Sequence, residues 1–138
     1  MAQLNAYLRF SGNCREAMTF YKDCLGGELT LQTIGESPVA SQMPPAAHKN
    51  IVHSSLVKDG WTLLGSDMMD SGDRVNGNAI SLSINCSSEE EIQTFFSKLA
   101  SGGKISYPLH TEFWGGMFGV LTDKYGNEWL LNYEKARA

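Results

Sequence analysis

The sequence has few of the features that mark several large classes of protein. Lysine and arginine form no cluster along the 138 residues, and fifteen acidic residues against eleven basic ones give a net charge of −4. A nucleic-acid-binding protein presents a basic surface to the phosphates, so no nucleic-acid partner is expected. No apolar run approaches the ~18 residues of a membrane-spanning helix, and no membrane partner is expected. The first residues lack the basic and apolar regions of a secretion signal, so we expect a cytoplasmic protein.

Cysteine is also scarce. The three cysteines, Cys14, Cys24 and Cys86, are odd in number and form no CxxC motif. Cys14 and Cys24 fall on one expected helix and cannot pair without unwinding it. No neighbouring histidine would activate any of the three thiols. We therefore predict reduced, structural cysteines.

The composition is that of an ordinary globular protein, with 42% hydrophobic and 19% charged residues, and its length suggests one domain. In the first half, apolar alternation from Leu4 to Phe10 predicts a strand. An apolar stripe over Cys14–Leu25 predicts a helix that ends at Gly26 and Gly27. Further strands are predicted over residues 28–34, 50–58 and 61–66, the last two joined by a tight turn at Asp59 and Gly60.

The second half repeats this order. Residues 79–84 alternate as a strand, Ser88 and Glu91 form a capping-box pattern, and an apolar stripe follows to Leu99. Gly102 and Gly103 end this helix, a strand begins at residues 104–107, and further strands are expected over residues 116–122 and Glu128–Tyr133. The two halves are offset by about 75 residues, which indicates an internal repeat. We predict an α+β fold of two tandem βαβββ modules, covering about residues 1–72 and 76–138, in a single domain.

Two segments lie outside this repeated pattern. Residues 35–49, with three prolines, form a loop long enough to serve as a lid. Residues 70–78 are expected to link the modules.

A set of motifs along nearly the whole chain carries a resemblance to a known family. They are Tyr7 to Ala17 (YLRFSGNCREA) with Phe20, Tyr21, Gly26 and Gly27; His53; Gly65, Ser66 and Asp67; Phe113, Trp114, Phe118 and Gly119; and Asp123 to Gly126 with Trp129 and Asn132. The sequence resembles the vicinal oxygen chelate superfamily of glyoxalases, bleomycin-resistance proteins and extradiol dioxygenases, and within it the PhnB-like branch. The resemblance implies curled mixed sheets, or half-barrels, around a cup, with helices outside and often a homodimer. The methyltransferase label once used for this branch is not expected to apply, since no glycine-rich strand–turn–helix motif for a nucleotide cofactor occurs.

The resemblance also implies where a divalent metal would bind. In metal-dependent members, His, Gln or Glu from the first and last strands of the modules hold the ion, and substrate oxygens fill the open positions. The matching positions here are Asn5, Ser81 or Ser83, and Leu130. The usual ligand set is thus absent, and no cofactor is predicted with a defined site. The remaining metal-ligand candidates are His53, His110 and Glu128, with Glu112 and Asn132 as further donors.

Structural roles compete with these chemical ones. His53 in mid-strand suits a barrel-lining histidine as well as a ligand, and Glu128 near a turn suits a solvated strand start. His48 is expected to be only solvated. Asp67, Asp70 and Asp123 are expected to accept hydrogen bonds from turn amides.

Two functions of different classes follow. The first is a binding module that holds a small molecule in an apolar cup at a dimer interface without a metal. Its pocket would be lined by His53, Phe113, Trp114 and Asn132, with Asn5 at the first-strand position. The alternative is a metal-dependent lyase, isomerase or dioxygenase with Glu128 or Glu112 as the catalytic proton shuttle. The missing ligand set favours the first, a partner-binding scaffold is a third reading, and catalysis itself is left open.

Overall fold

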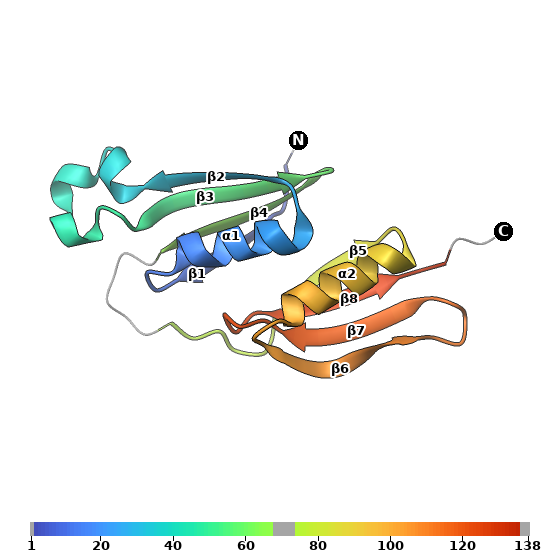
Figure 1. Ribbon diagram of the computed structural model, residues 1–138. Helices are drawn as coiled ribbons and strands as arrows, with labels where there is room; N and C mark the ends of the chain where they lie inside the picture. Colours follow the sequence, from blue (N-terminus) through green and yellow to red (C-terminus); the bar gives the residue numbers. More distant parts are fainter. Residues whose placement is uncertain (1, 68–73, 136–138) are drawn as a thin grey trace. The chain divides into compact units, whose positions relative to one another are not determined.

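The structure, a computed structural model, describes residues 2–67 and 74–135. The chain divides into two compact units, Met1–Arg74 and Val75–Ala138, which we call module one and module two (Figure 1). Each module contains one four-stranded mixed sheet and one α-helix, and neither sheet closes into a barrel within the described residues. The predicted α+β fold of two βαβββ modules is confirmed.

Module one follows the predicted order closely. Its elements are β1 (Ala6–Phe10), α1 (Cys14–Leu25), β2 (Glu28–Thr33), β3 (Ile51–Lys58) and β4 (Trp61–Asp67). The strands lie in the order β1-β4-β3-β2, with β1 parallel to β4 and the other pairs antiparallel. Asp59 and Gly60 join β3 to β4 with positive φ angles of 45° and 90°. A two-residue hairpin turn of this kind requires such angles, so the predicted turn is confirmed.

The helix of module one covers one face of its sheet. Ala17, Met18 and Tyr21 of α1 are fully buried against Phe10 and other apolar residues of the sheet. Burial of a large apolar side chain contributes about 1.5–3 kcal/mol each. The amphipathic stripe that predicted the helix is therefore also what attaches it to the sheet.

The start of α1 is held by a residue that is distant from it in the sequence. Asn13, the residue at the N-cap position, makes no capping hydrogen bond with its side chain. Instead, Asp67 at the end of β4 accepts hydrogen bonds from the backbone N–H groups of Gly12 (2.8 Å), Cys14 (3.0 Å) and Ile51 (2.8 Å). The predicted role of Asp67 in binding turn amides is confirmed, whereas Asp70 lies outside the described residues.

The loop between β2 and β3 is ordered by a histidine. It contains three short 3-10 turns, Ile34–Glu36, Ala40–Gln42 and Pro45–Ala47, gathered at one end of module one (Figure 1). The Nε2–H of His48 donates to the carbonyl oxygens of Ala40 (2.8 Å) and Met43 (3.1 Å). The expectation that His48 is only solvated is wrong, because its ring is held by two backbone carbonyl groups of the loop. The role of residues 35–49 as a lid stays a prediction.

Module two repeats the same topology. Its elements are β5 (Leu82–Cys86), α2 (Glu89–Ala100), β6 (Lys104–Thr111), β7 (Met117–Thr122) and β8 (Glu128–Tyr133), with the strands in the order β5-β8-β7-β6. Ser88 caps α2, since its hydroxyl accepts from the Glu91 backbone N–H at 3.0 Å. The Glu91 carboxylate accepts from the backbone N–H of Ser87 at 2.9 Å rather than from that of Ser88. The predicted capping box is thus half correct, displaced by one residue on its glutamate side.

The first strand of each module begins later than predicted. Leu4 and Ile80 are highly exposed and precede the strands, which start at Ala6 and Leu82. The strand predicted over residues 79–84 is therefore displaced to Leu82–Cys86. The pairing ladders begin at Ala6 with Leu63 and at Leu82 with Trp129. Apolar alternation reveals a strand's period, but the position of the partner strand decides where pairing starts.

Candidate functional site

Each sheet has one face covered by its helix and an opposite face that the helix does not cover, which we call the open face. Strand parity assigns residues to these faces, because successive side chains point to opposite sides. In β8, Trp129 and Leu131 are buried towards α2, whereas Glu128, Leu130 and Asn132 lie on the open face. The predicted shared face of these last three residues is confirmed.

The open face of module one carries His53. The His53 ring is exposed, and the Tyr7 hydroxyl lies 3.5 Å from its Nδ1. The two ring centroids are 6.1 Å apart at an interplanar angle of 39°. A neutral ring that accepts from the phenol at Nδ1 carries its proton on Nε2, and Nε2 has no hydrogen-bond partner within the described residues. Asn5, half-buried, immediately precedes β1.

The open face of module two is organised in cross-strand rows. One row runs from Asn85 through Asn132 and Phe118 to His110. Within it, the Asn132 side-chain amide donates to the Asn85 side-chain oxygen at 3.4 Å. The tertiary structure thus places two predicted site residues, Asn132 and His110, in one row on either side of Phe118.

Three rings on this open face form an aromatic cluster, which we define as Tyr107, His110 and Phe118. The centroid of His110 lies 4.7 Å from that of Tyr107 and 6.4 Å from that of Phe118, with interplanar angles of 83° and 81°. Tyr107 and Phe118 are 6.0 Å apart. Edge-to-face geometry of this kind is a favourable arrangement of aromatic rings. The cluster offers a half-exposed apolar surface with a polar rim.

Sequence reasoning missed Tyr107 as a site residue. A regular strand would put Tyr107 and His110 on opposite faces, but the pairing of β6 with β7 is irregular between Ile105 and Tyr107 and again between Tyr107 and His110. Pro108 lies in this stretch and has no backbone N–H to donate to a ladder. The proline was the one local signal that the parity of β6 would change.

Both ring nitrogens of His110 face acceptors. Nδ1 lies 3.0 Å from the Pro108 carbonyl oxygen, and Nε2 lies 2.5 Å from a carboxylate oxygen of Glu112. The Pro108 carbonyl, and after it the Glu112 carboxylate, raise the pKa of His110 above its usual value, because each favours a protonated nitrogen. A ring held in this way offers no lone pair to a metal ion.

The residues present do not fit a divalent metal site. Among residues 2–67 and 74–135, no three His, Cys, Asp or Glu side chains are grouped to hold an ion. His110 pairs with Phe118 and Glu128 with Thr122, four residues apart on β7 or about 13 Å. Glu128 accepts a hydrogen bond from the Ser81 hydroxyl. Within module two, His110 and Glu128 are thus not brought together, and no chemical step is derived through a metal.

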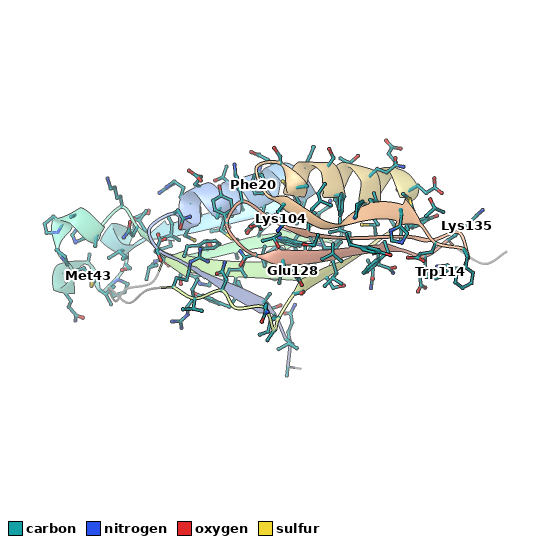
Figure 2. The ribbon with its side chains drawn as sticks, turned by 90° about the horizontal axis from the view of Figure 1, so that it is seen from below. Phe20, Met43, Lys104, Trp114, Glu128 and Lys135 are labelled. Atoms are coloured by element: carbon teal, nitrogen blue, oxygen red, sulfur yellow. The ribbon has the colours of Figure 1, made fainter. Side chains whose placement is uncertain are left out.

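Phe113 and Trp114 lie in the turn between β6 and β7. Phe113 is 96% exposed and Trp114 is 52% exposed, with their rings perpendicular at 5.1 Å. The turn is closed by the Glu112 backbone N–H, which donates to the Gly116 carbonyl at 2.6 Å. In Figure 2, Trp114 lies beside Lys135, at the opposite end of the module from Lys104 and Glu128. Both aromatic rings are accessible at the tip of a hairpin, and their contact with a ligand stays a prediction.

The cysteines are structural. All three are buried and none forms a disulfide, as predicted. Burial raises the pKa of Cys14 to about 11 and that of Cys86 to about 12, so neither is a thiolate near neutral pH. Asp123 is equally structural, since it accepts from the backbone N–H groups of Tyr125 and Asn127 and from the indole of Trp129. Its predicted role in the turn is confirmed.

Comparison with known proteins identifies the family. Residues 3–131 match the profile of the Glyoxalase/Bleomycin resistance protein/Dioxygenase superfamily, and the chain belongs to that superfamily. The resemblance drawn from its motifs is confirmed. None of the helices in the described parts of the chain is long and apolar enough to cross a membrane.

Similar proteins include a PhnB protein. Protein YjdN of Escherichia coli (strain K12) is 33% identical over 144 residues, covering 96% of this chain and 95% of that protein. The crystal structure of PA1353 from Pseudomonas aeruginosa is 35% identical, with a TM-score of 0.87, covering 99% of this chain and 100% of the other. The PhnB protein of Bacillus cereus, described as a putative 3-demethylubiquinone-9 3-methyltransferase, is 29% identical, with a TM-score of 0.78 and coverage of 96% and 100%.

Proposed function

We propose that this protein binds a small molecule with a planar apolar part on the open face of module two, without a metal. One observation carries the proposal: the aromatic cluster of Tyr107, His110 and Phe118 lies on a sheet face that the helix leaves uncovered. A buried aromatic side chain covers about 150–250 Å², and apolar burial contributes roughly 25 cal/mol per Å². Packing a ligand ring on this cluster would therefore contribute substantially to the free energy of binding.

Polar groups beside the cluster would orient such a ligand. Asn132 and Asn85 share one hydrogen bond, which leaves further donor and acceptor groups of both amides on the open face. Few, well-placed polar groups around an apolar surface are typical of small-molecule sites. His53, Asn5, Phe113 and Trp114 stay in the proposal as further lining residues.

A homodimer that completes the binding cup is part of the proposal, as is a cytoplasmic location. The superfamily resemblance supports the dimer, and a two-fold interface is the commonest kind. The metal-dependent lyase, isomerase or dioxygenase is not proposed, since the described donors are not grouped for an ion. Glu112 and Glu128 are accordingly assigned no catalytic step.

The test compares two residues of β6 with matched exposure. Tyr107 is 49% exposed and pairs with Val120, whereas Ile105 is 48% exposed and pairs with Leu121 on the helix-covered side. The probe is N-phenyl-1-naphthylamine, a neutral apolar dye whose fluorescence rises on binding. We expect Tyr107→Ala to weaken the dye's Kd by about tenfold, equivalent to about 1.4 kcal/mol, and Ile105→Ala to leave it unchanged.

Two results would overturn the proposal. One is equal weakening by both variants, with circular dichroism showing both folded. The other is no saturable dye binding by the unmodified protein. The statement that binding needs no metal has its own test, in which the protein is offered Mn, Fe, Co, Ni and Zn in turn. Near-stoichiometric uptake that is lost in His53→Ala would contradict it.

A further inference from the structure

The open face of module one has a different chemistry from that of module two. Arg9 on β1 pairs with Ser66 on β4, and Gln32 on β2 pairs with His53 on β3. Ser54 pairs with Gly65 in the antiparallel ladder of β3 and β4, so His53 and Ser66 occupy the next position of that ladder. Arg9, Ser66, His53 and Gln32 thus form one cross-strand row, which we call the donor row.

All four residues of the donor row present hydrogen-bond donors. Arg9 has five guanidinium N–H groups, and the other three supply a hydroxyl, a ring N–H and an amide. The contact between Tyr7 and Nδ1 of His53 leaves Nε2 of that ring as the outward nitrogen. Strands lie about 4.8 Å apart, so Arg9 and His53 flank Ser66 with about 10 Å between their backbones. That span suits one carboxylate or phosphate group held from both sides.

The local charge favours an anion, although the whole chain carries −4. Arg9 is exposed, whereas the Arg74 guanidinium, which donates to the Arg9 carbonyl at 3.4 Å, lies over the Phe10 ring on the other side of β1. The acidic residue on the open side of β2, Glu28, pairs with Val57 and lies four residues from Gln32, or about 13 Å. Arg9 is therefore the charged group that faces the open side of this row, because the Asp67 carboxylate next to Ser66 is buried on the helix-covered side.

We infer that the donor row binds the carboxylate or phosphate group of a small molecule, with Arg9 as the principal charged contact. Arginine suits this role because its planar fork matches both groups with two parallel hydrogen bonds. His53 contributes a ring N–H and Ser66 a hydroxyl donor between them. The inference shares His53 with the proposed function but goes beyond it, because it depends on charge rather than apolar contact and its row lies on module one.

The test follows backbone amide NMR shifts while inorganic phosphate, and in a second series acetate, replaces chloride at constant ionic strength. We expect saturable shifts centred on Arg9, Ser66 and His53. Arg9→Gln should weaken the Kd at least tenfold. Arg15→Gln removes the same charge from an exposed site on α1 and should change it less than twofold. Arg9→Lys keeps the charge but loses the planar guanidinium. Its change in Kd should lie between those of Arg9→Gln and Arg15→Gln.

Each outcome has a defined meaning. Tighter binding of phosphate identifies a phosphate-bearing ligand class, and acetate binding as tight or tighter identifies a carboxylate. Equal weakening by Arg9→Gln and Arg15→Gln would overturn the inference in favour of nonspecific charge, as would the absence of saturable shifts with both anions. Because the naphthylamine dye is neutral and its variants lie in module two, this inference and the proposed function fail independently.

Discussion

Modules one and two hold the amino-terminal end of their helix by different means. In module one, Asp67 reaches α1 from the end of β4 and accepts from three backbone N–H groups. In module two, the cap is local. The Ser88 hydroxyl accepts from the Glu91 backbone N–H, and the Glu91 carboxylate accepts from the Ser87 backbone N–H just before α2. Asp67 pairs with Phe10, and at the matching place in the other ladder Tyr133 pairs with Cys86. A tyrosine cannot cap a helix, so the second module supplies a local cap.

This difference teaches that one topology accommodates a long-range and a short-range solution to the same problem. The long-range cap of module one ties β4, α1 and the start of β3 together through one carboxylate. The local cap of module two stabilises its helix only. We therefore expect the two caps to contribute very differently to stability.

Among these substitutions, Asp67→Ala is expected to lower the free energy of unfolding most. The substitution leaves three backbone donors without their acceptor, at a cost of about 3 kcal/mol or more in the free energy of unfolding. Ser88→Ala should cost about 1 kcal/mol, the usual value for a lost helix cap. Urea unfolding of both variants measures the difference. Equal losses would show that Asp67 contributes no more than a local cap.

The modules also differ where helix and sheet approach most closely. A Cβ on Gly119 of β7 would lie 2.6 Å from Cε2 of Phe96 and 3.1 Å from Cα of Leu109. A Cβ on Gly65 of β4 would lie 3.1 Å from Sδ of Met18, part of a flexible side chain. Gly119→Ala should therefore cost about 1–3 kcal/mol through overpacking.

Gly65→Ala is the matched control and should cost less, because Met18 can move aside. Neither glycine has a positive φ, so backbone strain does not contribute to either substitution. Thermal unfolding of the two alanine variants provides the measurement. A greater loss for Gly65→Ala would reverse the assignment of the tighter interface to module two.

The smallest expected effect is a pH dependence confined to module two. The pKa of His110 is raised by the Pro108 carbonyl and the Glu112 carboxylate. The folded state thus holds the proton more tightly than the unfolded state. The resulting stabilisation is fully present below the ordinary histidine pKa of 6.5 and is lost as the pH rises through the raised folded value.

In module one, the position equivalent to His110 is Gln32, which pairs with His53 as His110 pairs with Phe118. Glutamine is therefore the replacement chosen for His110. We expect His110→Gln to lower the Tm more at a pH about one unit below the ordinary histidine pKa than in mildly alkaline buffer. Melting curves at both pH values test this. A Tm difference that is independent of pH would show that the contacts of His110 do not depend on its charge.

Local patterns predicted much of this fold. Helix α1 was predicted with its bounds at Cys14 and Leu25, because an apolar stripe and a following pair of glycines both lie within the segment itself. Strand β8 was likewise predicted as Glu128–Tyr133 from a pattern within its own segment. Leu4 and Ile80 were assigned to strands wrongly, since their alternation continues beyond the first pair of each ladder.

The candidate site was less predictable. The sequence suggested His53, His110 and Asn132 as candidate site residues, but not that His110 and Asn132 share a row with Phe118. Tyr107 joins the aromatic cluster only because the pairing of β6 is irregular. Arg9 becomes a candidate anion contact only when Ser66 is placed beside it.

By itself, the sequence determined the order of elements, the repeat, the apolar faces of both helices and the superfamily, all of which depend on spacings within short segments or on motif order. Only the tertiary structure decided which side chains share an open face and which carboxylate caps α1. These depend on the register between strands that are distant in the chain, and a shift of one residue would turn every side chain of a strand to the other face.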